Sequence, residues 1–351
     1  MTGVLTVARL EFKLRIRAGR WRWLVGAWFV VLAVVTWLVR TAASQPNIVG
    51  DSVAQERTLG VVMFGVVVLV VLALALLVAP ALAAQSVNGD RERGTLATLQ
   101  VTRLRAGEIA LGKLLASWGT ALVFLAVTLP LALWCYAEGG LSVGRIAGVY
   151  LVTALLLGVV CSISLGLSAL LARSTTSGVL AYLTVFALAA GTAITFGLVT
   201  ASTQQKVSGS SRICADAGAT NCTETSYETT IARPDRTWWL LAPNPFVVLA
   251  DSAPAGPVHR ERLPNGQVVE VPADVDILGS LSRELHRIRA TPQRVDDQYG
   301  TTFAVPEGVS GGPVWPLGLG IDLALAAGAL WLTTVRLRTP THRLARGQRV
   351  A

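Results

Sequence analysis

Six long apolar runs constrain the fold of this chain more than any other feature of its sequence. They cover residues 23–40, 60–85, 115–136, 146–172, 179–200 and 315–335. A helix that crosses the hydrocarbon core of a bilayer needs about 20 largely apolar residues, because that core is about 30 Å thick. Each run is continuously apolar and does not alternate, which indicates helices and not barrel strands. The sequence therefore predicts an all-α polytopic membrane protein with six transmembrane helices.

The composition supports a membrane location for most of the 351 residues. Hydrophobic residues make up 52% of the chain and charged residues only 15%, whereas a soluble domain carries about 25% charged residues. The net charge of +9 does not indicate a nucleic-acid partner, because the basic residues stand at the ends of apolar runs. The preference for arginine, alanine, valine and leucine fits a bacterial genome rich in G and C.

The first apolar run is expected to remain in the mature protein. It is long enough to span a membrane and ends at Arg40, and no small-x-small cleavage site follows it. Segment 1–22, which precedes the first span, is basic and apolar together. Residues 9–17, RLEFKLRIR, alternate with period two as a strand does. A lone strand at a membrane surface would leave its backbone unpaired, so we predict an interfacial helix whose arginines reach toward the headgroups.

The distribution of basic residues predicts the orientation. Cytoplasmic segments carry an excess of Lys and Arg over short outer loops. With the N-terminus in the cytoplasm, the short outer loops hold only Arg40, Arg57 and Arg145, whereas the inner segments and the tail 336–351 are rich in arginine. We therefore expect a multi-pass protein of the plasma membrane with both termini in the cytoplasm.

The segment 201–314 is then an extracytoplasmic subdomain between helices five and six, since long loops translocate largely regardless of charge. Within it, residues 238–250 are apolar but broken by two prolines, so we expect them to enter the interface without spanning. Apolar residues recur at helical spacing from Ile277 to Ile288, which predicts an amphipathic helix. Cys214 and Cys222 lie in a polar stretch and are expected either to form a disulfide in an oxidising compartment or to remain free thiols.

The inner loop between the second and third spans, within residues 86–114, is the most ordered of the polar segments. It reads DRERGTLATLQVTRLRAGEIALGK from Asp90 to Lys113. Thr95 is positioned to cap a short helix, and Glu108 is expected to open the helix that becomes span three. This loop is either a surface for a partner protein or a solvated inner loop that obeys the positive-inside rule.

The pattern of this loop resembles the signature of ABC-2 type permeases, the membrane subunits of type-2 ABC transporters, which are mostly exporters. The six-span layout, the basic segment before span one and the Asn244-Pro245-Phe246 motif are similar as well. Ala97 and Arg103 depart from the pattern, which often has an acid and a proline there. The resemblance implies that the loop docks on an ATPase subunit through Arg91, Glu92, Arg93, Gly94, Thr95, Leu96, Leu99, Arg103, Arg105 and Glu108.

The resemblance also implies the partners. Residues 107–114, GEIALGKL, imitate a phosphate-binding loop but lack its final hydroxyl and its preceding strand. We therefore expect no cofactor bound directly, with ATP and Mg used by a separate ABC ATPase subunit. A second permease subunit, identical or homologous, and the lipid bilayer complete the expected partners. Gly308 to Pro313 imitate a protease motif without its acid, and the three histidines are scattered, so no catalytic or metal site is expected.

Asp322 is the single acidic residue inside one of the six runs. An intramembrane carboxylate is a functional candidate, and the alternative is a hydrogen bond to a neighbouring helix. The largely aliphatic spans favour a lipidic or amphipathic cargo. Two other functions remain open: an ion-coupled secondary transporter and a membrane-embedded enzyme. The first of these usually places several ionisable groups in the middle of the membrane.

Overall fold

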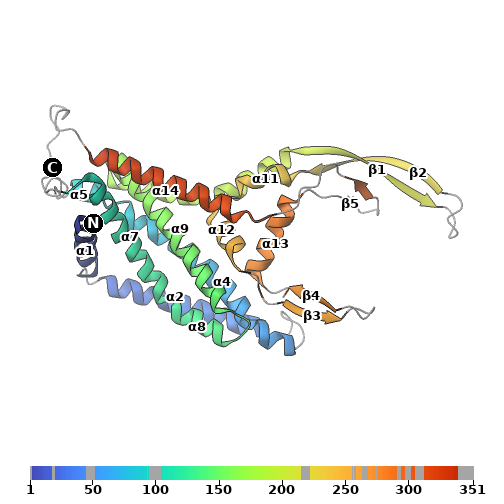
Figure 1. Cartoon of the computed structure of the whole chain (residues 1–351), viewed down its shortest axis with the longest axis horizontal. Coiled ribbons are helices and arrows are strands. Elements are labelled where there is room, and N and C mark those ends of the chain that lie inside the picture. The colour runs from blue at the N-terminus through green and yellow to red at the C-terminus, as the bar shows by residue number, and fades with distance from the viewer. Residues whose placement is uncertain are drawn as a thin grey trace.

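The structure is a computed structural model, and its helices and strands are labelled as in Figure 1. It describes residues 2–17, 20–44, 52–92, 94, 104–214, 222–254, 256, 258–262, 268–272, 276–290, 294–296, 302–304 and 312–338. Within these ranges, six helical segments are long and apolar enough to cross a membrane, and they coincide with the six predicted runs. The prediction of an all-α polytopic membrane protein is therefore confirmed. The predicted tail beyond residue 338 and most of the segment 308–313 lie outside the described residues.

Each span is built from one helix or from consecutive helices. Spans one, two, four and six are α2 (Arg20–Ala43), α4 (Ser52–Ala83), α9 (Val143–Leu170) and α14 (Trp315–Leu337). Span three is α7 (Ala106–Val127) followed by α8 (Leu129–Ala137), which begins with a proline in its first turn. Span five is α10 (Ser174–Phe186), the π-helix η1 (Ala187–Gly191) and α11 (Thr192–Ser202).

The two ends of the bundle carry different short elements (Figure 1). The N-terminal helix α1 (Thr2–Arg17) and the short helix α5 (Asn88–Glu92) lie at one end, which we call the α5 end. The helices α12 (Pro245–Ser252) and α13 (Ile277–Arg289) lie toward the other, the α12 end. The helix predicted within segment 1–22 is confirmed by α1, which packs against α7, and its place at the membrane interface remains a prediction.

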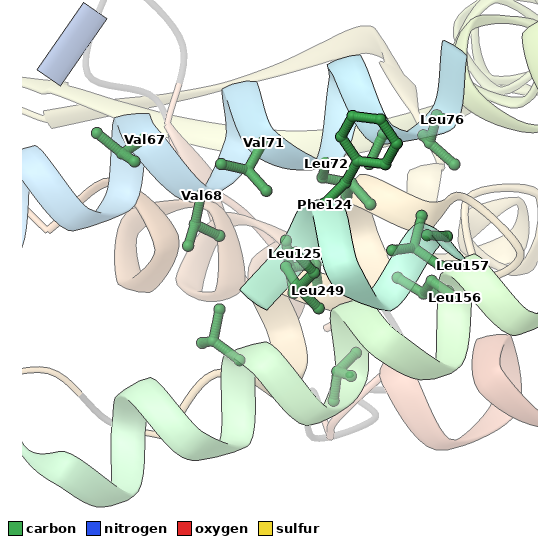
Figure 2. Close-up of a cluster of buried hydrophobic side chains, with 14 of the residues drawn as sticks. Val67, Val68, Val71, Leu72, Leu76, Phe124, Leu125, Leu156, Leu157 and Leu249 are labelled. Atoms are coloured by element: carbon green, nitrogen blue, oxygen red, sulfur yellow. The ribbon is translucent and has the colours of Figure 1, made fainter. Parts of the chain in front are cut away.

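The interior of the bundle is a cluster of aliphatic side chains. Figure 2 shows Val67, Val71 and Leu72 of α4, with Phe124 of α7 and Leu156 of α9 among the labelled members of this cluster. Lipid tails are as apolar as these residues, so close packing and not escape from water favours helix contact here. Many other large apolar side chains of the spans are exposed, as expected for residues that face lipid.

The segment between spans five and six contains both predicted and unpredicted structure. The predicted amphipathic helix forms as α13, and the proline-broken stretch forms the 3-10 turn η3 (Trp238–Leu240) and α12, preceded by the turn η2 (Pro234–Arg236). Three antiparallel hairpins were not predicted. They pair β1 (Gln204–Cys214) with β2 (Cys222–Ala232), β3 (Val258–Arg262) with β4 (Val268–Pro272), and β5 (Arg294–Asp296) with β6 (Thr302–Ala304).

The β1–β2 hairpin extends away from the helices (Figure 1). Its register places Cys214 directly opposite Cys222 at the far end of the ladder. Opposed residues of an antiparallel pair have Cα atoms about 4.5–5.5 Å apart, a separation that a disulfide accepts. The strands bring the two cysteines together, and their pairing remains a prediction.

Candidate functional site

The predicted coupling residues surround the short helix α5. Arg91 and Glu92 lie in it, and Gly94 follows it with a φ of 70°, a left-handed conformation that suits glycine. Arg105 and Glu108 lie at the start of α7. The other predicted residues lie outside the described part of the chain: Arg93, Thr95, Leu96, Leu99 and Arg103.

The beginning of α7 differs slightly from the prediction. The helix starts at Ala106 and not at Glu108, with Arg105 as the residue that precedes it. Glu108 Oε2 accepts a hydrogen bond from the backbone N–H of Arg105 over 2.9 Å. A glutamate at this third helical position satisfies a backbone donor that has no partner inside the helix. Glu108 therefore stabilises the helix start from within the first turn.

On one side, α5 and the residue before it are hydrogen-bonded to the C-terminal end of α9. Ser168 Oγ accepts hydrogen bonds from the backbone N–H groups of Val87 and Asn88, each over 3.2 Å. The guanidinium of Arg91 donates to the carbonyl oxygens of Ala169 and Leu171, over 3.4 and 3.5 Å. The last carbonyls of a helix lack partners inside it, and a cation is favourable there. Arg91 thus caps α9 from the neighbouring loop.

Two further bonds join this region to α10. Glu92 Oε1 accepts a hydrogen bond from the backbone N–H of Ser174, the first residue of α10, over 3.2 Å. A carboxylate at a helix N-terminus is stabilised by the exposed N–H groups and the helix dipole. Ser177 Oγ donates to the carbonyl oxygen of Ala84 over 2.9 Å, one turn before α5. The start of α10 is therefore attached to α5 and to the turn that precedes it.

The other side of α5 meets a buried lysine. The side chain of Lys113, on α7, is 0% exposed. Its Nζ donates to Oε1 of Glu11 on α1 over 2.6 Å, to the carbonyl oxygen of Ser86 over 2.9 Å, and to Oδ2 of Asp90 on α5. An ammonium has three N–H donors, so the three acceptors satisfy it completely. Lys113 therefore joins three elements that are distant in sequence.

The contact between α1 and α7 beside this lysine is very close. A Cβ atom added at Gly112 would lie 2.6 Å from Cβ of Val7. Only glycine allows the two helices to approach this far, which brings Glu11 within reach of Lys113. We call the set of bonds that Arg91, Glu92, Asp90, Ser168 and Lys113 make around α5 the α5 clamp.

Sequence reasoning did not find the buried part of the α5 clamp. Lys113 was counted as one of several basic residues of an inner loop, and Glu11 and Asp90 were not singled out. The signal that could have found them is the position of Lys113 between the apolar residues of IALGKLLA, since a lysine inside an apolar helix needs partners. Glu11 and Asp90 lie far from Lys113 in the sequence, and only the packing shows that they pair with it.

At the α12 end, buried ion pairs and capped helices hold the short elements. Arg145 Nη2 lies 2.6 and 2.8 Å from the two carboxylate oxygens of Asp276, and both side chains are buried. From the sequence, Arg145 was assigned to a short outer loop. In the structure it forms an ion pair with Asp276, the residue that precedes α13. Arg145 is therefore a buried, paired residue in the first turn of α9.

The buried carboxylate of Asp251 connects α12 with the two helices that follow it. Its Oδ2 accepts hydrogen bonds from the backbone N–H groups of Val314 and Trp315 over 2.6 and 2.8 Å, at the start of α14. Its Oδ1 accepts from Ser282 Oγ over 2.9 Å and lies 2.8 Å from Nε2 of His286, both on α13. The N-terminus of span six is thus fixed to α12 and α13.

The Asn-Pro-Phe motif fixes an irregular part of span five. Asn244 Oδ1 accepts from the backbone N–H of Phe246 over 2.9 Å, which caps α12. Its Nδ2 donates to the carbonyl oxygen of Ala189 over 2.7 Å and to Thr192 Oγ1 over 2.9 Å. Ala189 lies in the π-helix η1, where the regular bonding ladder is interrupted. The asparagine therefore holds α12 against that interruption.

Asp322 lies inside the bundle, 2% exposed, on α14. Its Oδ1 has no hydrogen-bond partner among the described residues, so the expected bond to a neighbouring helix is not formed by that oxygen. Beside it is a small cavity of about 10 Å³, lined mainly by aliphatic side chains of α4, α9 and α10. Asp322 is separate from the α5 clamp.

A comparison with protein families shows to which family the chain belongs. A model of the family described as ABC-2 family transporter protein matches residues 5–229, which is most of the chain and includes the α5 clamp. The chain belongs to the ABC-2 family. A comparison with curated proteins gave no match.

As an ABC-2 family member, the chain is a multi-pass membrane protein and the permease of an ABC transport system. It is a transport subunit and not an enzyme, and the family implies that an ABC ATPase subunit is its partner. The match covers α1, the spans from one to five and part of the β1–β2 hairpin, whereas Asp322 and span six lie beyond it.

Proposed function

We propose that this permease forms the translocation pathway of an ATP-driven exporter and receives movement from a separate ATPase through the α5 clamp. The ATPase would bind and hydrolyse ATP with Mg, and this chain would bind neither. A second permease subunit, identical or homologous, would complete the pathway. Both termini and α5 would lie in the cytoplasm of a plasma membrane, where the ATPase has its nucleotide.

The observation that carries this proposal is the bonding of α5 to four helices at once. Lys113 connects α5 to α1 and α7, whereas Ser168, Arg91 and Glu92 connect it to α9 and α10. Polar bonds shielded from water are strong and directional. A displacement of α5 would therefore move the ends of spans three, four and five together, as coupling requires.

The charges at the α12 end support the proposed orientation. Arg40 forms an ion pair with Glu138 over 2.6 Å, and Arg145 is paired with Asp276. Two of the three basic residues expected in the short outer loops are therefore neutralised by acids. The short outer loops hold few Lys and Arg residues compared with the inner segments, and an excess of Lys and Arg is typical of cytoplasmic segments.

To test the proposal, the tagged full chain is purified from its native cells, and the proteins bound to it are identified by mass spectrometry. We expect an ABC ATPase to co-purify in a fixed ratio. A chain that moves cargo alone, driven by an ion gradient, would contradict the proposal and favour the secondary transporter.

A paired substitution then tests the role of the α5 clamp in that complex. Glu92→Ala with Arg93→Ala should uncouple ATP hydrolysis from transport, because the bond to Ser174 and a neighbouring charge are lost. Arg338→Ala, an exposed arginine just after α14, is the matched control and should leave coupling unchanged. Unchanged transport in the double variant, with normal amounts of protein in the membrane, would overturn the coupling role.

A further inference from the structure

Asp322 is a buried carboxyl that lacks the partners an ionised carboxylate needs. It lies on α14 and is 2% exposed, and its Oδ1 accepts no hydrogen bond from any described residue. By helical rise, it lies about 10 Å along α14 from Trp315, and so away from the end of the bundle. An isolated charge in such surroundings is very unfavourable, and a carboxyl avoids it by keeping its proton.

The side chains that face Asp322 offer no opposite charge. The cavity of about 10 Å³ beside it is lined by residues of α4, α9, α10 and η1 and by Pro243 and Pro245. Apart from Asp322, the lining residues are leucines, valines and prolines, which neither titrate nor carry a charge. No neighbour around this cavity therefore stabilises the ionised form.

The cavity is also too small and too apolar to hydrate a charge. A volume of about 10 Å³ holds at most about one water molecule, and a buried water needs about two to four polar partners. Among the side chains that line the cavity, only that of Asp322 is polar. Water therefore does not replace the missing partners of the carboxylate in this conformation.

A proton fits this site better than a larger cation. A hard metal ion binds about six oxygen ligands, and within the described residues no group of three or more His, Cys, Asp or Glu side chains could hold a metal ion. The cavity leaves no room for an organic cation. A proton needs neither space nor further ligands, because it binds covalently to one carboxylate oxygen. A neutral carboxyl therefore satisfies all of the constraints at Asp322.

One wall of the cavity belongs to span five, which is irregular at this level. Val185 lies in the last turn of α10 and Leu188 in η1. A π-helix interrupts the regular ladder of backbone hydrogen bonds and is found frequently at functional sites. Asn244 holds η1 through the carbonyl oxygen of Ala189, over 2.7 Å. A movement of span five at η1 would separate this wall from Asp322 and admit water.

We propose that Asp322 is a proton-binding site of the permease, neutral while the cavity is closed and ionised when span five moves away from it. On opening, the O–H bond of the carboxyl breaks and its proton passes to a water molecule, which leaves a hydrated carboxylate and a hydronium ion. On closing, the reverse transfer returns the proton. The inference goes beyond the proposed function, since it links the movement of the helices to one proton whatever drives that movement. An acidic medium then favours the closed state.

Infrared spectroscopy of the purified full chain, in a detergent without ester groups, tests the site. A neutral carboxyl has a C=O stretching band that is separate from the bands of carboxylates and amides and that shifts in heavy water. We expect the wild type to show this band at neutral pH. Asp322→Asn, which has nearly the shape of the neutral acid and should fold, should lack it, and Asp322→Glu should retain one. Glu284→Gln removes an exposed carboxylate of α13 and should leave the band unchanged.

The stability of the protein gives a second, independent measurement. In the unfolded chain an aspartate releases its proton above about pH 4, whereas the folded chain keeps the proton of Asp322. The wild type should therefore lose stability relative to Asp322→Asn as the pH rises above about 4. Its unfolding equilibrium constant should rise by up to about tenfold per pH unit relative to that of the variant. Below about pH 4 the difference between the two proteins should be constant.

A further variant tests the role of span five. Asn244→Ala removes the bond that holds η1, so the proton of Asp322 should exchange with heavy water faster than in the wild type, as the shift of its infrared band shows. Thr184→Val, which removes a hydroxyl bonded to Leu180 of the same helix, is the matched control and should exchange as the wild type does.

Three outcomes would overturn the inference. These are the absence of a band that depends on Asp322, a stability difference between the wild type and Asp322→Asn that does not change with pH, and equally fast exchange in the wild type and Asn244→Ala. None of these measurements needs an ATPase, so their results are distinct from the test of the proposed function. A chain that co-purifies with an ATPase but has an ionised Asp322 would keep the proposed function and lose the inference.

Discussion

Nζ of Lys113 lies 2.6 Å from Oε1 of Glu11, and this pair joins the first helix of the chain to the third span across 102 residues of sequence. The helix α1 is therefore attached to the bundle and does not rest on lipid alone. Since Lys113 also bonds Asp90 of α5, the same ammonium connects α1 to the region proposed to meet the ATPase.

Replacement of Lys113 tests this connection. Lys113→Met removes the ammonium that the carboxylates of Glu11 and Asp90 share. Removal of one partner of a buried ion pair costs about 3–5 kcal/mol, so we expect a clear fall in the melting temperature of the purified protein. Lys13→Met, which removes an exposed lysine of α1, should change the melting temperature little. Equal stability of the two variants would contradict the buried role of Lys113.

The close approach of α1 and α7 gives a second prediction. Gly112→Leu places a side chain where Cβ alone would lie 2.6 Å from Cβ of Val7, so α1 must move away. Overpacking of this kind costs about 1–3 kcal/mol. Gly119→Leu, also on α7, is the matched control, because no atom lies within 4 Å of a Cβ added there. Limited proteolysis should cut between α1 and α2 faster in the Gly112 variant only.

The ion pair of Arg145 and Asp276 gives a third prediction. Each of Arg145→Met and Asp276→Leu leaves a buried charge unpaired and should destabilise the protein by about 3–5 kcal/mol. The double variant should recover much of that loss, because no unpaired charge remains. Melting temperatures of the four proteins complete the cycle. Losses that simply add in the double variant would mean that the two residues act independently.

The pair of Arg40 and Glu138 predicts a pH dependence. The hydrogen bond from the Arg40 guanidinium holds the pKa of Glu138 below its ordinary value of 4.5. A carboxyl whose pKa is lower in the folded state stabilises the fold above its unfolded pKa, and this contribution is lost as the pH falls through the folded pKa. The wild type should therefore lose more stability than Glu138→Gln when the pH is lowered below about 4.5. The difference should be small, because solvent screens this partly exposed pair.

The opposed cysteines of the β1–β2 hairpin predict the side of the membrane on which it lies. After mild reduction, a thiol reagent that does not cross membranes should label Cys214 and Cys222 in intact cells. Cys135 and Cys161 are buried in the spans and should not react, so Cys214→Ser with Cys222→Ser is the control. Labelling that requires cell lysis would invert the proposed topology.

The features that the sequence predicts well are those that depend on composition over many residues. The six spans follow from the high cost of polar groups in hydrocarbon, and α13 follows from its apolar spacing. The period-two pattern around Glu11 does not form a strand, in agreement with the predicted helix, because α1 packs against α7. The local sequence pattern predicts secondary structure less well where tertiary contacts determine it.

The parts of the structure that could not be predicted depend on pairing between distant segments. Nothing near Arg145 in the sequence indicates Asp276, and nothing near Lys113 indicates Glu11. The strand β2 alternates Thr, Tyr and Ile with polar residues from Thr223 to Ile231, and this strand signal was overlooked. The π-helix η1 is stabilised by Asn244, a residue from another segment. Such contacts require the packed structure.

Hydrogen bonds and ion pairs constrain the two ends of the bundle more than its middle. The α5 clamp fastens spans three, four and five at one end, and Asp251 fastens span six to α12 and α13 at the other. We therefore expect bending during a transport cycle to concentrate midway along span five, at the π-helix η1. The π-helix would then act as a hinge between the two fastened halves of span five.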